Sequence, residues 1–343
     1  MKICVVGAGA VGGMLAVRLA NTGAEVCVVD QGEHLQAMQR NGLRLILKDG
    51  SQILSRNIKF AQTSTELEIS DIIILGVKAH EIESVASELP NLYGSRSIVI
   101  TVQNGIPWWY FQNHGGEFDG TRLNTLDPHG IIMEHIPASR VIGGVAYPGC
   151  EVLEPGVIHL IEGNRFAFGE LERRITSRSK RVSNLFCAAG FKSYALEDIR
   201  TEIWLKAWGA LAFNPISALT RATMEEICQC TSTRNLAACM MKEAKEVATR
   251  LGIAFRHSID KRINEGELVG AHKTSMLQDV EAGRSLEIGA VTGSVLELAK
   301  LTHTDCPIIS AVYSCLELLD RTIKTNDLNS KSQIQVLAPI SML

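Results

Sequence analysis

The sequence lacks a long hydrophobic run and lacks an excess of basic residues. No window approaches the roughly 20 uninterrupted apolar residues that a membrane-spanning helix needs, so we expect no membrane segment. The first apolar run enters a glycine-rich turn at once, which is not the pattern of a secretory signal. Lys and Arg number 34 against 37 Asp and Glu without a basic cluster, which argues against a nucleic-acid partner. These absences favour a cytoplasmic protein.

Paired cysteine motifs are also missing. The nine cysteines are scattered and odd in number, which indicates reduced thiols in a cytoplasm. Cys228 and Cys230 stand two apart without a second ligand pair at zinc spacing, so we expect no metal site.

The remaining pattern divides the chain in two. Strand and helix patterns alternate over residues 1–198, whereas residues 199–325 show almost only helical periodicity, and residues 326–343 form a tail without an assigned fold. The expected fold class is α/β: a Rossmann-type doubly wound parallel sheet with an antiparallel extension, followed by an all-helical C-terminal domain.

The start of the chain has the order of a dinucleotide-binding unit. A buried strand at residues 2–6 precedes a G-x-G-x-x-G turn, a helix closed by Gly23 and a second strand at residues 25–30. The free N–H groups and the dipole of that helix can receive phosphates. The predicted cofactor-binding residues of the turn are Gly7, Ala8, Gly9, Ala10, Val11 and Gly12.

Asp30 ends the second strand, 18 residues after Gly12. A carboxylate there can accept hydrogen bonds from both adenosine ribose hydroxyls and would repel a 2′-phosphate, which favours NAD over NADP. Arg40 lies too far along the following helix pattern to reverse that preference.

Two further buried strands end on polar residues. Residues 71–78 finish at Lys78, and residues 97–105 finish at Asn104 and a glycine. Open α/β sheets bind ligands at the carboxyl ends of their strands, so both side chains are candidate site residues. The alternatives are a surface lysine and an Asn-Gly turn.

Later patterns complete the expected first domain. Short glycine-punctuated runs from residue 140 to about 170 suggest antiparallel strands that extend the sheet, with His159 as a strand-face residue. Residues 175–189 are typical of a helix, and a short connector over residues 191–198 follows.

The helical part carries polar groups in unusual places. Lys206, Ala210 and Asn214 share one face of a tryptophan-rich helix that we expect to stop near Pro215. A buried lysine without a partner costs free energy, and the structural alternative is a stem that packs while its ammonium reaches water. A second helix is expected from about residue 284 to 301. By spacing alone, Ser275 and Glu287 could be caps or surface groups.

Six segments in order resemble the ketopantoate reductase (2-dehydropantoate 2-reductase) family, from the N-terminus to about residue 321. They are GAGAVGG at residues 7–13, VKA around Lys78, QNG around Asn104, PGVIH before residue 160, WLKAWGALAFNPISALT around Lys206, and SMLQDVEAGRSLEI at residues 275–288. The resemblance implies a Rossmann domain, a helical domain and an active site in the cleft between them.

The resemblance also implies the roles of individual residues in reducing a small-molecule 2-keto acid. Lys206 matches the general acid that protonates the ketone oxygen as hydride arrives from the nicotinamide. Asn214 matches a residue at the hydroxyl end of the substrate, and Ser275 resembles its carboxylate-binding serine. Glu287 resembles the acid close to cofactor and substrate. Lys78 and Asn104 are similar to residues beside the nicotinamide ribose and the reacting carbon.

Two positions depart from the family pattern. Ala210 stands where many members have an asparagine, so one donor to the substrate is missing. Asp30-Gln31-Gly32 replaces a sequence with an arginine for the 2′-phosphate, which suggests NAD although the typical reductase uses NADPH.

The sequence therefore leaves alternatives to reduction of 2-dehydropantoate to pantoate. One is an NAD-dependent D-2-hydroxyacid dehydrogenase acting on a larger or more apolar acid. Another is a dinucleotide-binding regulator without catalysis. Members of the family are found both as monomers and as homodimers, and the sequence does not decide between the two.

Overall fold

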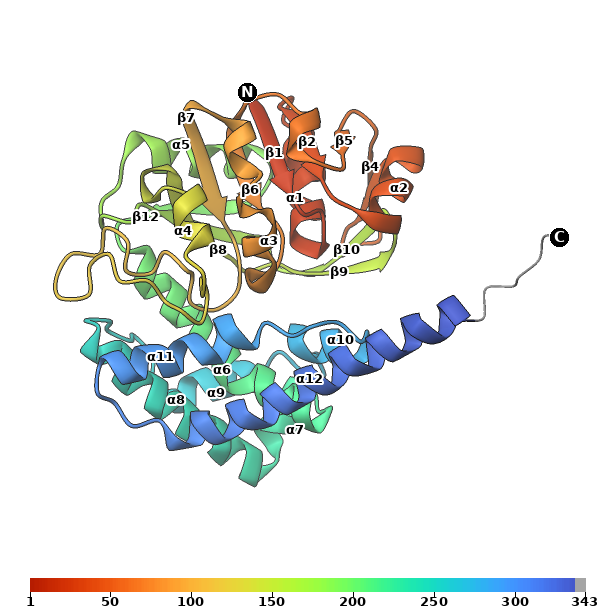
Figure 1. Cartoon of the computed structure of the whole chain (residues 1–343). Helices are drawn as coiled ribbons and strands as arrows, with labels where there is room; N and C mark the ends of the chain where they lie inside the picture. Colours follow the sequence, from red (N-terminus) through yellow and green to blue (C-terminus); the bar gives the residue numbers. More distant parts are fainter. Residues whose placement is uncertain (337–343) are drawn as a thin grey trace. The chain divides into compact units, whose positions relative to one another are not determined.

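The computed structural model describes the backbone of residues 1–336 and the side chains of residues 1–325 (Figure 1). Residues 337–343, part of the predicted tail, lie outside the described residues. The chain forms two compact units, Met1–Ile203 and Trp204–Leu343.

The first unit contains a sheet of eight strands. Its order is β12 (Lys192–Leu196), β11 (Arg165–Gly169), β8 (Val141–Ala146), β7 (Tyr93–Thr101), β6 (Ser70–Leu75), β1 (Lys2–Val6), β2 (Glu25–Val29) and β5 (Lys59–Ala61). The six strands from β8 to β5 are parallel, and β11 joins β8 antiparallel. Together with the helical second unit, this sheet confirms the predicted fold class.

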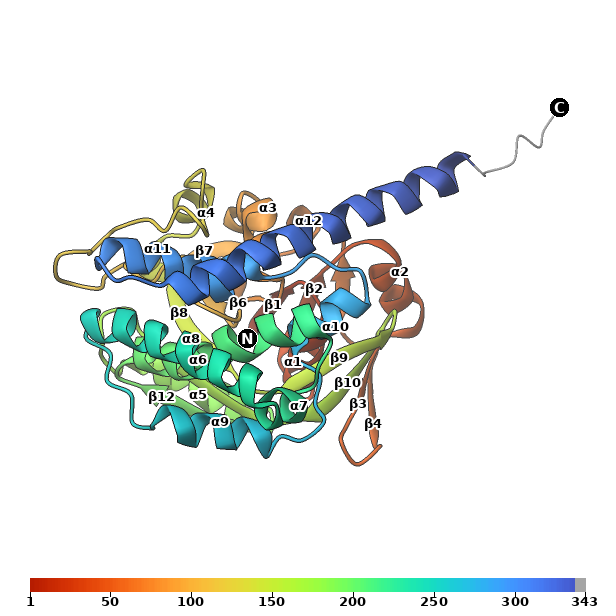
Figure 2. The ribbon, with the colours of Figure 1, turned by 90° about the horizontal axis from the view of Figure 1, so that it is seen from below.

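A smaller sheet of four strands belongs to the same unit and can be followed in Figure 2. Its order is β4 (Gln52–Ser55), β3 (Leu43–Ile46), β10 (Val157–Glu162) and β9 (Gly149–Glu154). Helix α1 (Ala10–Ala20) contacts strands of both sheets. A Cβ atom on Gly13 of α1 would come 2.8 Å from a side-chain carbon of Ile158 in β10. The absence of a side chain at Gly13 therefore lets the small sheet pack closely on α1.

The remaining helices of the first unit are α2 (Gly32–Asn41), α3 (Ile82–Ala86), α4 (Ile131–His135) and α5 (Ser177–Ala188). Helix α5 packs on β11 and β12. The core of the unit contains fully buried residues of both sheets and of α1, among them Val5, Leu15, Ile74, Ile158 and Phe166.

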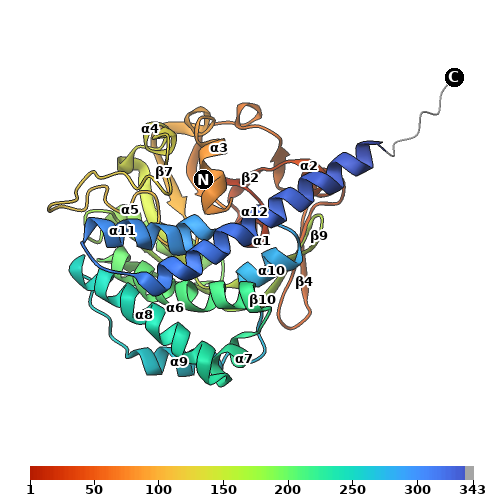
Figure 3. The same cartoon turned by 60° about the horizontal axis from the view of Figure 1, so that its bottom comes forward.

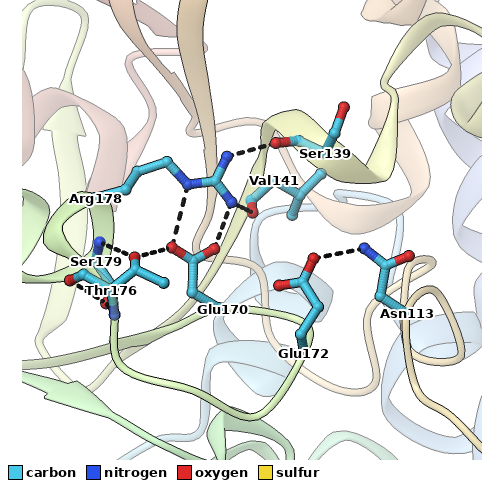
Figure 4. A network of polar contacts seen from close by, with 8 residues as sticks. All are labelled: Asn113, Ser139, Val141, Glu170, Glu172, Thr176, Arg178 and Ser179. Atoms are coloured by element: carbon cyan, nitrogen blue, oxygen red, sulfur yellow. Dashed lines mark hydrogen bonds and ion pairs between the residues drawn. The ribbon is translucent and has the colours of Figure 1, made fainter.

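A buried ion pair joins the start of α5 to the sheet (Figure 4). Arg178 contacts the carboxylate of Glu170, which is 2% exposed and directly follows β11. The same guanidinium donates to the carbonyl oxygens of Ser139 and Val141, before and in β8. Thr176, the N-cap of α5, also donates to Glu170. Because this carboxylate has several donors, its burial is compensated.

The structure corrects two predictions in this unit. Of the runs between residues 140 and 170, only β11 extends the large sheet in antiparallel pairing. Strand β8 pairs parallel with β7, and β9 and β10 pair with each other in the small sheet, where β10 is parallel to β3. The predicted connector after α5 contains strand β12, which pairs parallel with β11. His159 lies on β10, as the pattern predicts, and its Nδ1 is 2.9 Å from the Glu151 carboxylate of β9.

The second unit is helical (Figures 2 and 3). Helices α7, α8 and α9 pack against one another, and α11 and α12 both contact α8. Within the described residues, no helix is long and apolar enough to cross a membrane. The helices are α6 (Ile199–Thr220), which begins in the first unit, α7 (Met224–Gln229), α8 (Thr231–Arg250), α9 (Ile259–Glu267), α10 (Ser275–Glu281), α11 (Ser294–Leu301) and α12 (Pro307–Val336), with a π-helical turn at Gly289–Gly293.

Two predicted helix boundaries in this unit are wrong. Pro215 lies inside α6, which continues to Thr220 because its neighbours Phe213 and Ile216 are buried, so tertiary packing outweighs the lost backbone hydrogen bond. Residues 284–287 are not helical, since the helical segment begins at residue 288.

Candidate functional site

The glycine turn between β1 and α1 is shaped by close backbone contacts. Gly7 has φ +89°, a conformation that favours glycine, and its N–H donates to the Val29 carbonyl over 2.8 Å. A Cβ on Gly12 would lie 2.0 Å from the Gly7 carbonyl oxygen, so only glycine fits there. Gly9 differs, because a Cβ there would meet nothing within 4 Å. The open side of Gly9 is where a pyrophosphate can approach the helix N-terminus, so the turn fits a dinucleotide.

Asp30 is held beside this turn. Its carboxylate accepts the N–H of Ala8 over 2.6 Å and the N–H of Gln31 over 2.7 Å. His34 in α2 contacts the carbonyl of Ala8 over 2.9 Å. Arg40 lies in the last turn of α2, is exposed, and donates to the Gln36 carbonyl. The charged side chain that is fixed beside the turn is therefore the acid Asp30, and not Arg40.

Lys78 and Asn104 follow the adjacent strands β6 and β7. Gln103, which precedes Asn104, donates from Nε2 to the carbonyls of Leu75 over 2.7 Å and of Val77 over 3.0 Å. The side-chain amide of Gln103, which follows β7, thus binds the backbone at the end of β6 and just after it. Sequence patterns alone did not single out Gln103, and its position next to Asn104 in the QNG segment is the signal that could have found it.

Lys206 lies in α6, two residues from each of the buried Trp204 and Trp208. Burial lowers its pKa to about 8, because desolvation penalises the ammonium form, and the negative charge of Glu287 acts in the opposite direction. The structure therefore brings Lys206 and Glu287 within electrostatic range, although 81 residues separate them in sequence. The indole of Trp208 donates to the Met241 carbonyl of α8 over 2.7 Å, which fixes this part of α6.

Asn214 and Ala210 lie on the same helix as Lys206 and are half-buried. Ser275 is the first residue of α10 and is exposed. Its neighbour Thr274 is the N-cap, with a hydroxyl that accepts the N–H of Leu277 over 3.3 Å. The capping role that the sequence left open for Ser275 therefore belongs to Thr274.

The segment before Glu287 is held by two acids that no sequence pattern had indicated. Asp279 in α10 binds the guanidinium of Arg284 over 2.9 Å. Asp320 in α12 is 5% exposed and accepts the N–H of Leu286 over 2.8 Å and the hydroxyl of Ser285 over 3.2 Å. A carboxylate from a distant helix thus satisfies a backbone donor that would otherwise be orphaned.

No group of three or more His, Cys, Asp or Glu residues that could hold a metal ion occurs among the residues with a described structure. The candidate groups are the glycine turn with its acid and the polar strand exits in the first unit, and the lysine–glutamate pair in the second.

Comparisons with known proteins cover most of the chain. Residues 3–107 match the family model "Ketopantoate reductase PanE/ApbA", and residues 198–320 match the model of its C-terminal part. A 2-dehydropantoate 2-reductase of Mesorhizobium japonicum is 44% identical over 320 residues, which cover 93% of this chain and 98% of the relative.

The chain belongs to the ketopantoate reductase family. It is accordingly an oxidoreductase. A solved putative ketopantoate reductase from Ralstonia solanacearum MolK2 is 36% identical, with a TM-score of 0.89 over 94% of this chain and 98% of that chain. A D-mandelate dehydrogenase solved with NADH and anilino(oxo)acetate shares the fold at 20% identity, with a TM-score of 0.81 over 94% of this chain and all of that chain. The sequence resemblance to the family is thus confirmed.

Proposed function

We propose that the protein reduces 2-dehydropantoate to pantoate with a nicotinamide dinucleotide and uses Lys206 as the general acid. The relative that is 44% identical carries the name of this activity over nearly its whole length. The observation in the chain itself that supports the proposal best is the half-buried Lys206 with its pKa lowered to about 8 and Glu287 nearby.

The nicotinamide supplies hydride to the C2 carbonyl. The residues of the chain stabilise the charge on the carbonyl oxygen and orient the keto acid. An ammonium with a pKa of about 8 is mostly protonated at neutral pH and loses its proton far more readily than an ordinary lysine. It donates that proton to the oxygen as negative charge develops there. Glu287 favours the charged lysine, and therefore keeps the acid protonated before each turnover.

The other predicted residues bind and orient in this proposal. Asn214 and Ser275 hold the hydroxyl and carboxylate ends of the keto acid, whereas Lys78 and Asn104 lie beside the nicotinamide ribose. The glycine turn, residues 7–12, receives the pyrophosphate.

We propose NAD as the preferred cofactor. The carboxylate of Asp30 is fixed beside the turn by the N–H groups of Ala8 and Gln31, and an acid there accepts ribose hydroxyls but repels a 2′-phosphate. In this proposal the acid at residue 30 outweighs the preference for NADPH that is typical of the family.

A second candidate is an NAD-dependent D-2-hydroxyacid dehydrogenase for a different 2-keto acid. Ala210 favours it, because a methyl group between Lys206 and Asn214 cannot donate a hydrogen bond to a polar substrate.

Parallel steady-state kinetics test both candidates. The purified protein is assayed by nicotinamide absorbance with 2-dehydropantoate and with branched and aryl 2-keto acids, each with NADH and with NADPH. We expect the highest kcat/KM for 2-dehydropantoate with NADH. A higher value for an aryl or branched acid supports the second candidate, and turnover with none of these acids contradicts both.

A further inference from the structure

Two cysteines face each other across the strands that lead to the glycine turn. Strands β1 and β2 are parallel neighbours, and Cys4 is the direct partner of Cys27 in their register. Side chains of paired residues point to the same face of a sheet, and the strands lie about 4.8 Å apart. That spacing falls within the Cα separation of roughly 4.4–6.8 Å that a disulfide spans. No other two cysteines of the described residues are partners in a strand ladder.

The two thiols have different surroundings. Cys4 is fully buried, and a hydrogen bond with Cys27 together with burial raises its pKa well above the usual range. Cys27 is partly exposed and donates its S–H to the Ile3 carbonyl over 3.5 Å. Hydrogen bonding with Cys4 lowers the pKa of Cys27, with further contributions from Ser70 and the ammonium of Lys59.

Lys59 is the register partner of Cys27 on its other side, in β5. A partly exposed thiol beside a cation is typical of a reactive cysteine, whereas a buried thiol without a cation is inert. Cys306 belongs to the second kind, because it is buried and burial is the main cause that raises its pKa to about 12. Cys27 is therefore suited to attack, with Cys4 next to it as the second thiol.

We propose that Cys4 and Cys27 form a reversible disulfide driven by hydrogen peroxide. The Cys27 thiolate attacks one peroxide oxygen, so that the O–O bond breaks, a sulfenic acid forms and hydroxide leaves. The Cys4 thiol then displaces the sulfenic oxygen as water, and the S–S bond forms. The two thiols are oxidised, and one peroxide is reduced to two waters. A dithiol reductant reverses the reaction.

The position of this bond gives it a consequence for the proposed cofactor site. Cys4 precedes Gly7 by three residues, and Cys27 precedes Asp30 by three. The strand ends are already coupled, since the Gly7 N–H donates to Val29. The S–S bond removes the S–H that Cys27 donates to the Ile3 carbonyl, and it fixes the two strands to each other three residues before the turn and the acid. Oxidation is therefore expected to weaken dinucleotide binding, and this second step rests on the proposed function.

Peptide mapping of the full-length protein tests the bond itself. The reduced protein is treated with equimolar hydrogen peroxide, its remaining thiols are alkylated, and it is digested with trypsin without reductant. Cys4 and Cys27 fall in the separate peptides 3–18 and 19–40, because Arg18 lies between them. We expect one linked species that disappears with dithiothreitol.

The variants Cys27→Ser and Cys4→Ala should each abolish the linked species, whereas Cys187→Ser, which removes an exposed cysteine elsewhere, should retain it. Absence of the linked species in wild type, or its persistence in Cys27→Ser, overturns the proposal.

NADH titration followed by fluorescence tests the consequence. We expect peroxide-treated wild type to bind NADH roughly tenfold more weakly, a change of about 1.4 kcal/mol. Dithiothreitol should restore the affinity, and Cys27→Ser should show no change on treatment. A linked species with unchanged NADH affinity overturns the regulatory step. Failure of the reduced protein to bind NADH or NADPH contradicts the proposed function instead. The result of the peptide mapping is not affected by that outcome.

Discussion

At the scale of single residues, the proposed function depends on two charged groups. Asp30 is fixed beside the glycine turn, and Lys206 lies half-buried close to Glu287. Both could be singled out from the sequence, because an acid at the end of a second strand and a lysine in an apolar helix are unusual. The electrostatic pairing of Lys206 with Glu287 could not be derived from spacing, since it depends on how helices of the second unit pack.

Replacing Asp30 tests the cofactor preference. In Asp30→Ala the ribose hydroxyls lose an acceptor and the 2′-phosphate loses a repulsive charge, so KM for NADH should rise about tenfold. KM for NADPH should stay equal or fall. Steady-state kinetics with both cofactors measure the ratio, with Asp49→Ala, at an exposed acid in the β3–β4 turn, as the control. An equal rise for both cofactors would contradict the assignment.

Replacing Glu287 tests the electrostatic pair. The proposed general acid Lys206 can donate a proton only while it is protonated, so reduction should fall as pH rises through about 8. Glu287 raises the pKa of Lys206, and in Glu287→Gln that pKa is lower still. The alkaline limb of the pH profile of kcat should therefore move to lower pH. Glu246→Gln, an exposed acid on α8, is the matched control. An alkaline limb that stays at the same pH or moves to higher pH would contradict the electrostatic interaction between Lys206 and Glu287.

At the scale of elements, the sequence predicted what depends on local pattern. The strand–turn–helix start, the change to helices near residue 199 and the β10 position of His159 all follow from periodicity and glycine placement. Contacts between distant elements decided the rest. Helix α6 continues beyond Pro215 because its neighbours are packed in the core. Residues 192–196 form a strand because they pair with β11. Asp320 of α12 caps an irregular segment where a helix was expected.

Asp320 is expected to act as a positioning residue for Glu287. Asp320→Ala leaves the Leu286 N–H without its acceptor, which should cost about 1–3 kcal/mol of unfolding free energy. It should also lower kcat and move the alkaline limb in the direction seen for Glu287→Gln. Denaturant unfolding and the pH profile of kcat measure both effects.

Two further variants separate the acceptor from the charge. Asp320→Asn keeps an acceptor oxygen and should lie between wild type and Asp320→Ala. Lys324→Ala removes the exposed ion-pair partner of Asp320 at 2.6 Å and should change little. If Asp320→Ala lost stability without any change in the pH profile, Asp320 would have a purely structural role.

At the scale of the whole molecule, the proposed site residues are divided between two compact units. The first unit holds the glycine turn with its acid and the strand exits, and the second holds the lysine–glutamate pair. Membership of the ketopantoate reductase family covers both parts of the chain, over residues 3–107 and 198–320. We propose as the central claim that the nicotinamide supplies hydride and Lys206 supplies a proton to the same keto acid.

The most direct test of that claim is the kinetics of Lys206→Ala with 2-dehydropantoate and NADH, alongside NADH binding to the same variant. Loss of the general acid should lower kcat about 10²–10⁴-fold, while the NADH dissociation constant stays close to that of wild type. Turnover at the wild-type rate in Lys206→Ala would contradict the account.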